Sequence, residues 1–220
     1  MFELHWAGER LVLLPERAAY LPDHGLLLVA DAHIGKAATF RRLGVPVPEA
    51  TTAGTLARLD AALVRTGARG VVFLGDLLHS AHAHAAVTVA AVDAWRRRWP
   101  ALALHLVRGN HDRRAGDPPP HWRVESVDEA LVVGGLQLCH EPHDDAAQAV
   151  VAGHVHPGVV IGGRGFDRLR LPCFHLRGSL LLLPAFGEFT GLHVMARQDG
   201  DRVFVVAESA VRELPPRGGT

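Results

Sequence analysis

The first half of the chain alternates short apolar runs with segments whose apolar residues recur at helical spacing. A continuous apolar run such as 26–30 is typical of a strand buried on both faces, whereas Leu56, Leu59 and Leu63 repeat along one helix face. The pattern predicts strands over 26–30, 70–74 and 102–107 and helices over 49–66 and 84–98, with a loop at 44–48. Such alternation favours right-handed β–α–β crossovers.

The second half is richer in short β-type runs, which Gly, Pro and Asp turns separate. The runs lie near 131–139, 149–152, 158–162, 179–183, 192–196 and 202–207, and the pattern adds a hairpin over 4–15 and a short helix over 144–149. We therefore expect an α/β (α+β) fold with two sheets packed face to face and helices outside. Without a long linker, the chain predicts a single domain over 1–214 and a disordered tail over 215–220.

Composition excludes several classes of protein. With 220 residues, of which 48% are hydrophobic and 21% charged, the chain can bury a core, so disorder is excluded for most of its length. Its 23 basic and 23 acidic residues balance, which argues against binding long nucleic acid by bulk electrostatics but leaves room for a local basic site. The sequence shows neither a run of 18 apolar residues nor a secretory signal, so we expect no membrane span and a cytoplasmic location.

Individual residue types change the picture further. The chain has 15 His but only two Cys, which fits a reducing compartment and leaves His, carboxylate and amide groups to hold any metal. The chain contains a single Lys (Lys36) and a single Asn (Asn110). Asn110 lies within a Gly-Asn-His-Asp sequence, where its amide oxygen is available as a ligand.

Polar clusters follow the predicted strands at the point where each strand ends. In the first half these clusters are Asp31-Ala-His33, Gly75-Asp76 with His79, and Gly109-Asn110-His111-Asp112; in the second half they are His140-Glu141 and Gly153-His154-Val-His156. Ligands of α/β proteins bind outside the carboxyl ends of the strands, so we expect the five clusters to meet at one edge. We also expect the glycines at 75, 109 and 153 to let the backbone turn sharply there.

This donor set is what a two-metal centre needs. Asp76 can bridge two ions, and the imidazoles and the Asn110 amide can complete their coordination. Two ions roughly 3.5–4 Å apart can hold a bridging hydroxide and clamp a phosphoryl group for in-line displacement. Each His or Asp alone would more often be an ordinary core or capping residue, so the prediction rests on the complete set.

In order along the chain, these five motifs resemble those of the calcineurin-like metallophosphoesterase family. Further stretches are similar to a bacterial subgroup encoded beside a DNA ligase and a helicase: Asp31 to Lys36, Gly44 to Pro48, Gly75 to Ser80, His140 to Pro142, Leu171 to Phe174 and Leu183 to Gly187. The resemblance implies a four-layer αββα sandwich and a phosphoesterase that uses two divalent ions. Manganese is the first expectation for the metal, and iron or zinc are alternatives.

The resemblance also assigns roles to residues. One ion would be held by Asp31, His33, Asp76 and His156, and the other by Asp76, Asn110, His140 and His154. His111 would act as the general acid toward the leaving oxygen, and Asp112 would orient its imidazole. His79 would lie beside the ligands rather than on an ion.

Other residues leave their roles open. Lys36, Arg41 and Arg42, like Arg113 and Arg114, either contact phosphate or are solvated surface charges. His82 and His84 favour an exposed helix start over a third metal site, and Arg96 to Arg98 favour a solvated helix face over a nucleic-acid contact. We expect Phe174, Phe186 and Phe189 to belong to the core.

The main functional hypothesis is a phosphodiesterase that acts in DNA repair as a ligase-associated nuclease. Whether it also hydrolyses phosphomonoesters is left open. The partners implied are a phosphoester substrate, DNA among the candidates, and the ligase and helicase. One alternative is a phosphatase or phosphodiesterase for a small metabolite or nucleotide. The other is a non-catalytic partner module of the ligase or helicase. The sequence leaves the oligomeric state open.

Overall fold

The computed structural model describes residues 1–42, 44, 51–143, 148–162 and 168–216. The predicted loop over 44–48, the helix over 144–149 and the tail over 215–220 lie largely outside these ranges. Ala149, the last residue of that predicted helix, begins a strand instead. In the described ranges, no helix is both long enough and apolar enough to span a membrane.

Seven strands form the first sheet, in the order in which they occur along the chain. They are β1 (Phe2–Trp6), β2 (Glu9–Leu13), β3 (Ala19–Leu21), β4 (Leu26–Val29), β5 (Gly70–Leu74), β6 (Ala103–Val107) and β7 (Val124–Val127). β1 to β4 pair antiparallel, whereas β4 to β7 pair parallel. The parallel strands place the carboxyl ends of β4, β5 and β6 at one edge of the sheet.

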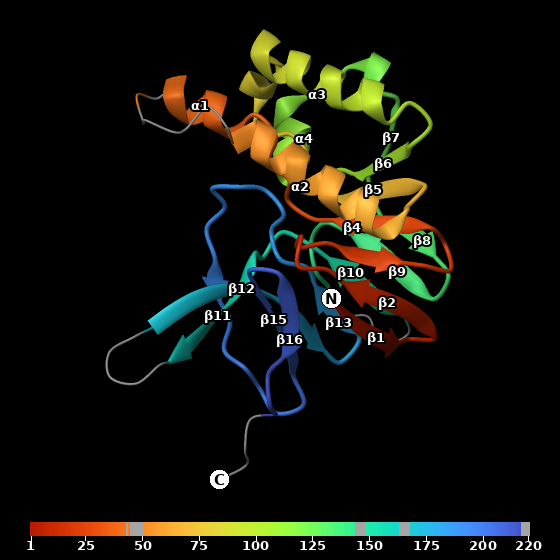
Figure 1. Cartoon of the computed structure of the whole chain (residues 1–220), viewed down its shortest axis with the longest axis vertical. Helices are drawn as coiled ribbons and strands as arrows, with labels where there is room; N and C mark the ends of the chain where they lie inside the picture. The colour runs from red at the N-terminus through yellow and green to blue at the C-terminus, as the bar shows by residue number, and fades with distance from the viewer. Residues whose placement is uncertain (43, 45–50, 144–147, 163–167, 217–220) are drawn as a thin grey trace.

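The helices lie on one face of this sheet (Figure 1). They are α1 (Lys36–Arg42), α2 (Thr51–Thr66), α3 (Ala86–Arg98) and α4 (Asn110–Ala115), with 3₁₀ turns η1 (Ala81–His84) and η2 (Pro120–Trp122). Leu59 and Leu63 of α2 and Trp95 of α3 pack in one buried cluster with strand residues such as Val71 and Phe73. Thus the apolar stripe predicted for residues 49–66 is the face that covers the sheet.

The second sheet has nine strands and packs on the opposite face of the first. They are β8 (Leu131–Val133), β9 (Leu136–Cys139), β10 (Ala149–Ala152), β11 (Pro157–Gly162), β12 (Arg168–Arg177), β13 (Leu180–Leu182), β14 (His193–Val194), β15 (Arg202–Ala207) and β16 (Ala210–Glu213). Its centre is also parallel, since β10 pairs in parallel with β9 and β13. Phe174 and Phe204 pack between the sheets against β-strand residues of the first sheet, such as Leu28 and Val72.

The two packed sheets and the α/β class confirm the predicted fold. The outer face of the second sheet carries two small apolar clusters, which side chains such as Met195 and Leu214 help to cover. No helix of the described residues contributes to these two clusters. The helices that the structure describes therefore belong to one of the two outer layers of the expected αββα order.

Candidate metal centre

The loops after β4 and β5 are joined by backbone hydrogen bonds that continue the parallel ladder beyond the strands. The amide of His33 donates to the carbonyl of Asp76 at 2.8 Å, and the amide of Ile34 donates to the carbonyl of Leu77 at 2.8 Å. His79 N–H returns a bond to the carbonyl of Ile34 at 3.1 Å. The first two motifs are therefore held side by side by main chain alone.

Five of the seven predicted metal ligands lie in the left-handed region of backbone space. These are Asp31 (φ 53°), His33 (45°), Asp76 (51°), His154 (68°) and His156 (54°). Non-glycine residues rarely adopt this conformation, which costs about 1–3 kcal/mol at each position and concentrates at functional sites. The described part of the chain has ten such residues, so half of them belong to this one site.

The motif glycines are required mainly for space. A Cβ on Gly75 would lie 2.1 Å from Nδ1 of His140, and one on Gly109 would lie 2.2 Å from Oδ1 of Asp76. A Cβ on Gly153 would lie 2.8 Å from Oδ2 of Asp31. Only Gly75 has a positive φ, so the predicted sharp turn holds there, whereas the other two glycines admit a ligand side chain.

Two buried carboxylates lie at the centre of the site. Asp31 is fully buried, and its Oδ2 accepts a bond from the amide of His154 at 2.9 Å. Its Oδ1 has no hydrogen-bond partner among the described residues, although Nε2 of His156 lies 3.5 Å away. Oδ1 of Asp76 accepts from the amide of His111 at 2.9 Å. A buried carboxylate oxygen without a partner is costly unless a cation completes it.

The histidines around these carboxylates present nitrogen lone pairs. Burial, followed by repulsion from the Lys36 ammonium, lowers the pKa of His33 to about 2, so this imidazole is neutral at physiological pH. Nδ1 of His33 lies 3.3 Å from Nδ1 of His79, which leaves Nε2 toward Asp76 at 3.9 Å. Nδ1 of His140 donates to the carbonyl of Leu74 at 3.0 Å, because a carbonyl only accepts.

That bond fixes what the other nitrogen of His140 can do. In the neutral ring Nε2 then carries a lone pair, yet it faces Oδ1 of Asn110 at 3.1 Å and Oδ1 of Asp76 at 3.5 Å. Nδ1 of His154 also lies 3.1 Å from it. The lone pair of Nε2 thus meets two acceptor oxygens, a grouping of ligand atoms that fits a divalent cation.

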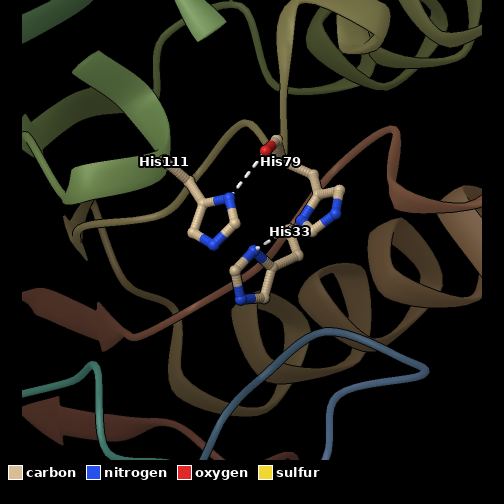
Figure 2. Close-up of side chains that lie close together, drawn as sticks. All are labelled: His33, His79 and His111. Atoms are coloured by element: carbon tan, nitrogen blue, oxygen red, sulfur yellow. Dashed lines mark hydrogen bonds between the residues drawn. The ribbon is translucent and has the colours of Figure 1, made fainter. Parts of the chain in front are cut away.

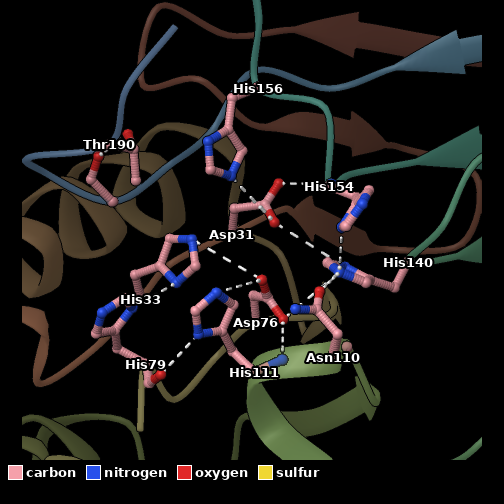
Figure 3. A network of polar contacts seen from close by, with 12 residues as sticks. Asp31, His33, Asp76, His79, Asn110, His111, His140, His154, His156 and Thr190 are labelled. Carbon is pink, nitrogen blue, oxygen red and sulfur yellow. Dashed lines mark hydrogen bonds and ion pairs between the residues drawn. The ribbon is translucent and has the colours of Figure 1, made fainter. Parts of the chain in front are cut away.

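All seven predicted ligands lie in one polar network (Figure 3). The potential ligand atoms of Asp31, His33 and His156 lie within 4.8 Å of one another, as do those of Asp31, Asp76 and His140. The sequence analysis predicts that Asp76 is the ligand shared by two ions. In the structure Asp31 also belongs to both of these groups of potential ligands. The third such group joins His33, His79 and His111 (Figure 2).

His111 lies at the accessible side of the network, with its side chain 31% exposed. Its Nδ1 donates to the backbone carbonyl of His79 at 2.7 Å, and its ring stacks on the His79 ring with centroids 4.8 Å apart. Nε2 lies 3.9 Å from Oδ2 of Asp76. The orientation of this imidazole is therefore set by His79.

The role predicted for Asp112 is corrected by this geometry. Its two carboxylate oxygens accept backbone bonds from Leu78 and Gly109, both at 2.9 Å. The bond from Gly109 caps α4, of which Asp112 is the third residue, and the bond from Leu78 holds the loop after β5. The carboxylate is buried, and desolvation raises its pKa. Asp112 thus fixes the loops that carry Asp76 and Asn110 rather than the ring of His111.

The residues whose roles were open divide between the site and the scaffold. Lys36 is half-buried at the start of α1, where burial lowers its pKa while attraction to the carboxylates of Asp31 and Asp76 raises it. His82 and His84 are exposed and belong to no candidate metal group of the described residues. Two of the arginines bind backbone groups of the scaffold: Arg113 donates to the carbonyl of Asp128, and Arg96 donates to the carbonyls of Trp99 and Trp122.

The three phenylalanines expected in the core differ in their exposure. Phe174 and Phe186 are fully buried. Phe189 is 58% exposed, so its assignment to the core is wrong. It lies in the turn 187–190, where Thr190 Oγ1 donates to the carbonyl of Gly187 at 2.9 Å, and this turn pushes the ring outward.

Comparison with solved structures finds several similar chains. The Pseudomonas putida nuclease MPE has a TM-score of 0.86 and 42% sequence identity, covering 97% of this chain and 99% of that one. The phosphoesterase Yfce from E. coli is more distant, with a TM-score of 0.44 and 14% identity over 87% of this chain and 99% of that one. A predicted phosphoesterase from Streptococcus pneumoniae has a TM-score of 0.34 and 16% identity, covering 86% of each chain. Neither a scan against protein-family models nor a search of curated proteins found a match.

Proposed function

The chain belongs to the metallophosphoesterase family, and we propose that it hydrolyses phosphodiester bonds with two divalent ions bound at this site. One observation carries the proposal. The carboxylates of Asp31 and Asp76 are buried within 4.8 Å of each other and of His140, and Oδ1 of Asp31 has no hydrogen-bond partner in the described chain. Two carboxylates that are buried so close together need cations to offset their desolvation.

The seven side chains divide naturally between two ions. Asp31, His33 and His156 would hold the first ion with Asp76, and Asn110, His140 and His154 would hold the second ion with Asp76. When bound, the ions would polarise the phosphoryl group and lower the pKa of water. The His, carboxylate and amide set is borderline in softness, which supports manganese first and iron or zinc as alternatives.

His111 supplies the proton in this proposal. The carbonyl of His79 accepts from Nδ1 in both protonation states, so Nε2 is the nitrogen that gives up a proton to the leaving oxygen. Nε2 lies 3.9 Å from Oδ2 of Asp76, so this nitrogen faces the centre of the site. Positioned proton transfer of this kind contributes about 10²- to 10⁴-fold to the rate.

A phosphodiester in DNA is the substrate that we favour. The match to a protein described as a nuclease over nearly the whole of both chains supports this choice. Lys36, the only lysine, lies close enough to Asp31 and Asp76 to interact with both carboxylates and can contact a phosphate there. A role in DNA repair beside a ligase and a helicase is part of the proposal.

The test is hydrolysis by metal-loaded protein. We expect Mn²⁺-loaded protein to hydrolyse a chromogenic phosphodiester and to cut single-stranded or nicked DNA. Asp76→Asn should bind less metal and lose turnover. His111→Ala should keep the metal but lose turnover. Unchanged turnover in both variants would refute the assignment.

Two other functions have distinct outcomes in the same experiments. Cleavage of mononucleotide esters without cleavage of any DNA would favour the small-metabolite phosphoesterase. Capture of a ligase or helicase that persists after chelation, without hydrolysis, would favour the non-catalytic module.

A further inference from the structure

Phe189 presents an exposed aromatic ring from a strained backbone. Its φ is 58°, in the left-handed region, and the residue is 58% exposed. Phe186, three residues earlier, is fully buried, so the sequence between them turns the second ring away from the core. A bulky residue in this conformation persists only where its surroundings enforce it, and such outliers concentrate at functional sites.

The segment that carries Phe189 is attached at both ends to residues of the metal centre. The amide of Gly187 donates to the carbonyl of Asp31 at 3.0 Å, and the amide of His193 donates to the carbonyl of His156 at 2.9 Å. Phe189 is two residues from the first attachment, so its Cα is at most about 7.6 Å from that of Gly187, two steps of about 3.8 Å. Thr190, the next residue, is drawn beside the polar network, on the side of His156, in Figure 3.

Further bonds pin the start of this segment. The amide of Phe186 donates to the carbonyl of Ala30 at 2.8 Å, and the guanidinium of Arg58 donates to the carbonyl of Phe186. The amide of Glu188 donates to Oγ1 of Thr55 at 3.4 Å, and its carboxylate pairs with Arg58 at 3.6 Å. The ring of Phe189 is thus presented by a fixed backbone, which limits the ordering needed when a ligand binds.

We propose that Phe189 is a stacking platform for a nucleobase of the phosphodiester substrate, an inference that rests on the function proposed above. Nucleobases stack on aromatic side chains without regard to sequence, because every base has a π-face. The chain has no net charge with which to hold a polynucleotide, so apolar contact beside the scissile phosphate would add to the binding that a local basic group such as Lys36 supplies. One ring is far smaller than the roughly 800 Å² per partner of a protein interface, which argues against a protein ligand.

The test compares two chromogenic diesters that share a leaving group. Thymidine 5′-(p-nitrophenyl phosphate) carries a base, and methyl p-nitrophenyl phosphate does not. The measured quantity is the ratio of kcat/KM for the nucleoside ester to kcat/KM for the methyl ester, in Mn²⁺-loaded protein. We expect Phe189→Ala to lower this ratio about 5- to 150-fold, the range that loss of one base–aromatic stack gives.

Two further variants separate stacking from other effects. Phe189→Trp should keep or raise the ratio. Leu169→Ala, which removes a side chain that is 59% exposed on β12, should leave the ratio within twofold. A ratio that Phe189→Ala leaves within twofold, while both esters are still hydrolysed, overturns the platform alone. Failure of the wild-type protein to hydrolyse either ester overturns the proposed function and the platform together.

Discussion

Asn in place of Asp31 should stabilise the metal-free protein. Oxygens of Asp31 and Asp76 lie within 4.8 Å of each other, and two unit charges at that distance repel by about 3.5 kcal/mol at an effective dielectric of about 20. The substitution removes this repulsion but weakens the bond from the amide of His154 by about 1 kcal/mol, because the acceptor is no longer charged. The net gain of about 2.5 kcal/mol corresponds to a rise in Tm of roughly 5–10 °C for a chain of this size.

The order of stabilities should reverse when metal is added. Wild-type protein gains about 2.7 kcal/mol per site at a metal concentration of about 100 Kd, whereas Asp31→Asn lacks one ligand charge and gains less. Thermal unfolding at pH 8 in chelator and in excess Mn²⁺ measures both differences. A lower Tm for Asp31→Asn in chelator would refute the reasoning, because the carboxylates would then not repel each other.

Asp201 provides the matched control, a buried carboxylate that has a cationic partner in Arg177. Arg177 donates to both of its oxygens at 2.8 and 2.9 Å, and His175 lies 2.9 Å away. Asp201→Asn should lower Tm in chelator and in metal alike, because it removes the carboxylate charge that Arg177 binds.

Three other predictions follow from particular contacts. Arg177 holds the pKa of Asp201 below its usual value, so the stabilisation that Asp201 provides is complete above pH about 4 and is lost as pH falls further. Urea titrations between pH 7 and 2.5 should therefore show a smaller loss of unfolding free energy for Asp201→Asn than for wild type. Gly109→Ala should reduce kcat/KM at least about 100-fold by displacing Asp76, whereas Gly162→Ala, with open space at its Cβ, should not; equal rates for the two variants would contradict the steric argument. Burial raises the pKa of Cys173 to about 12 and that of Cys139 to about 11, so both thiols should resist iodoacetamide at pH 8 in folded protein and react in urea, as mass spectrometry can follow.

The sequence predicts best where one pattern dominates a segment. Strands such as β5 and β15 have the predicted bounds, because continuous apolar runs between turn residues leave few alternatives. The longest described strand, β12, is not predicted, since Pro172 lies inside it and proline argues against a strand interior. Its pairing with β11, β13 and β15 compensates for this weak local signal.

The candidate site divides in the same way. Which residues gather at the strand ends follows from topology, so the grouping of the seven ligands with His111 was accessible from sequence. The contacts of each side chain could not be predicted from sequence, because they depend on the path of the backbone after each strand ends. The carbonyl of His79, rather than Asp112, fixes the ring of His111, and no residue type marks a backbone acceptor. Phe189 likewise reads as an apolar residue until its φ and exposure are known.

The construction of the centre explains why metal and fold should be coupled. Main-chain groups hold the carboxylates: the amide of His154 binds Asp31, and the amide of His111 binds Asp76. Those amides are presented by the same segments that supply ligand side chains, so a shift of one segment moves both a ligand and the support of another. Left-handed backbone at five ligands and two close carboxylates raise the energy of the metal-free site. Bound cations would relieve the carboxylate repulsion, and the apolar layer between the sheets supplies the stability that keeps the strained loops in place without them.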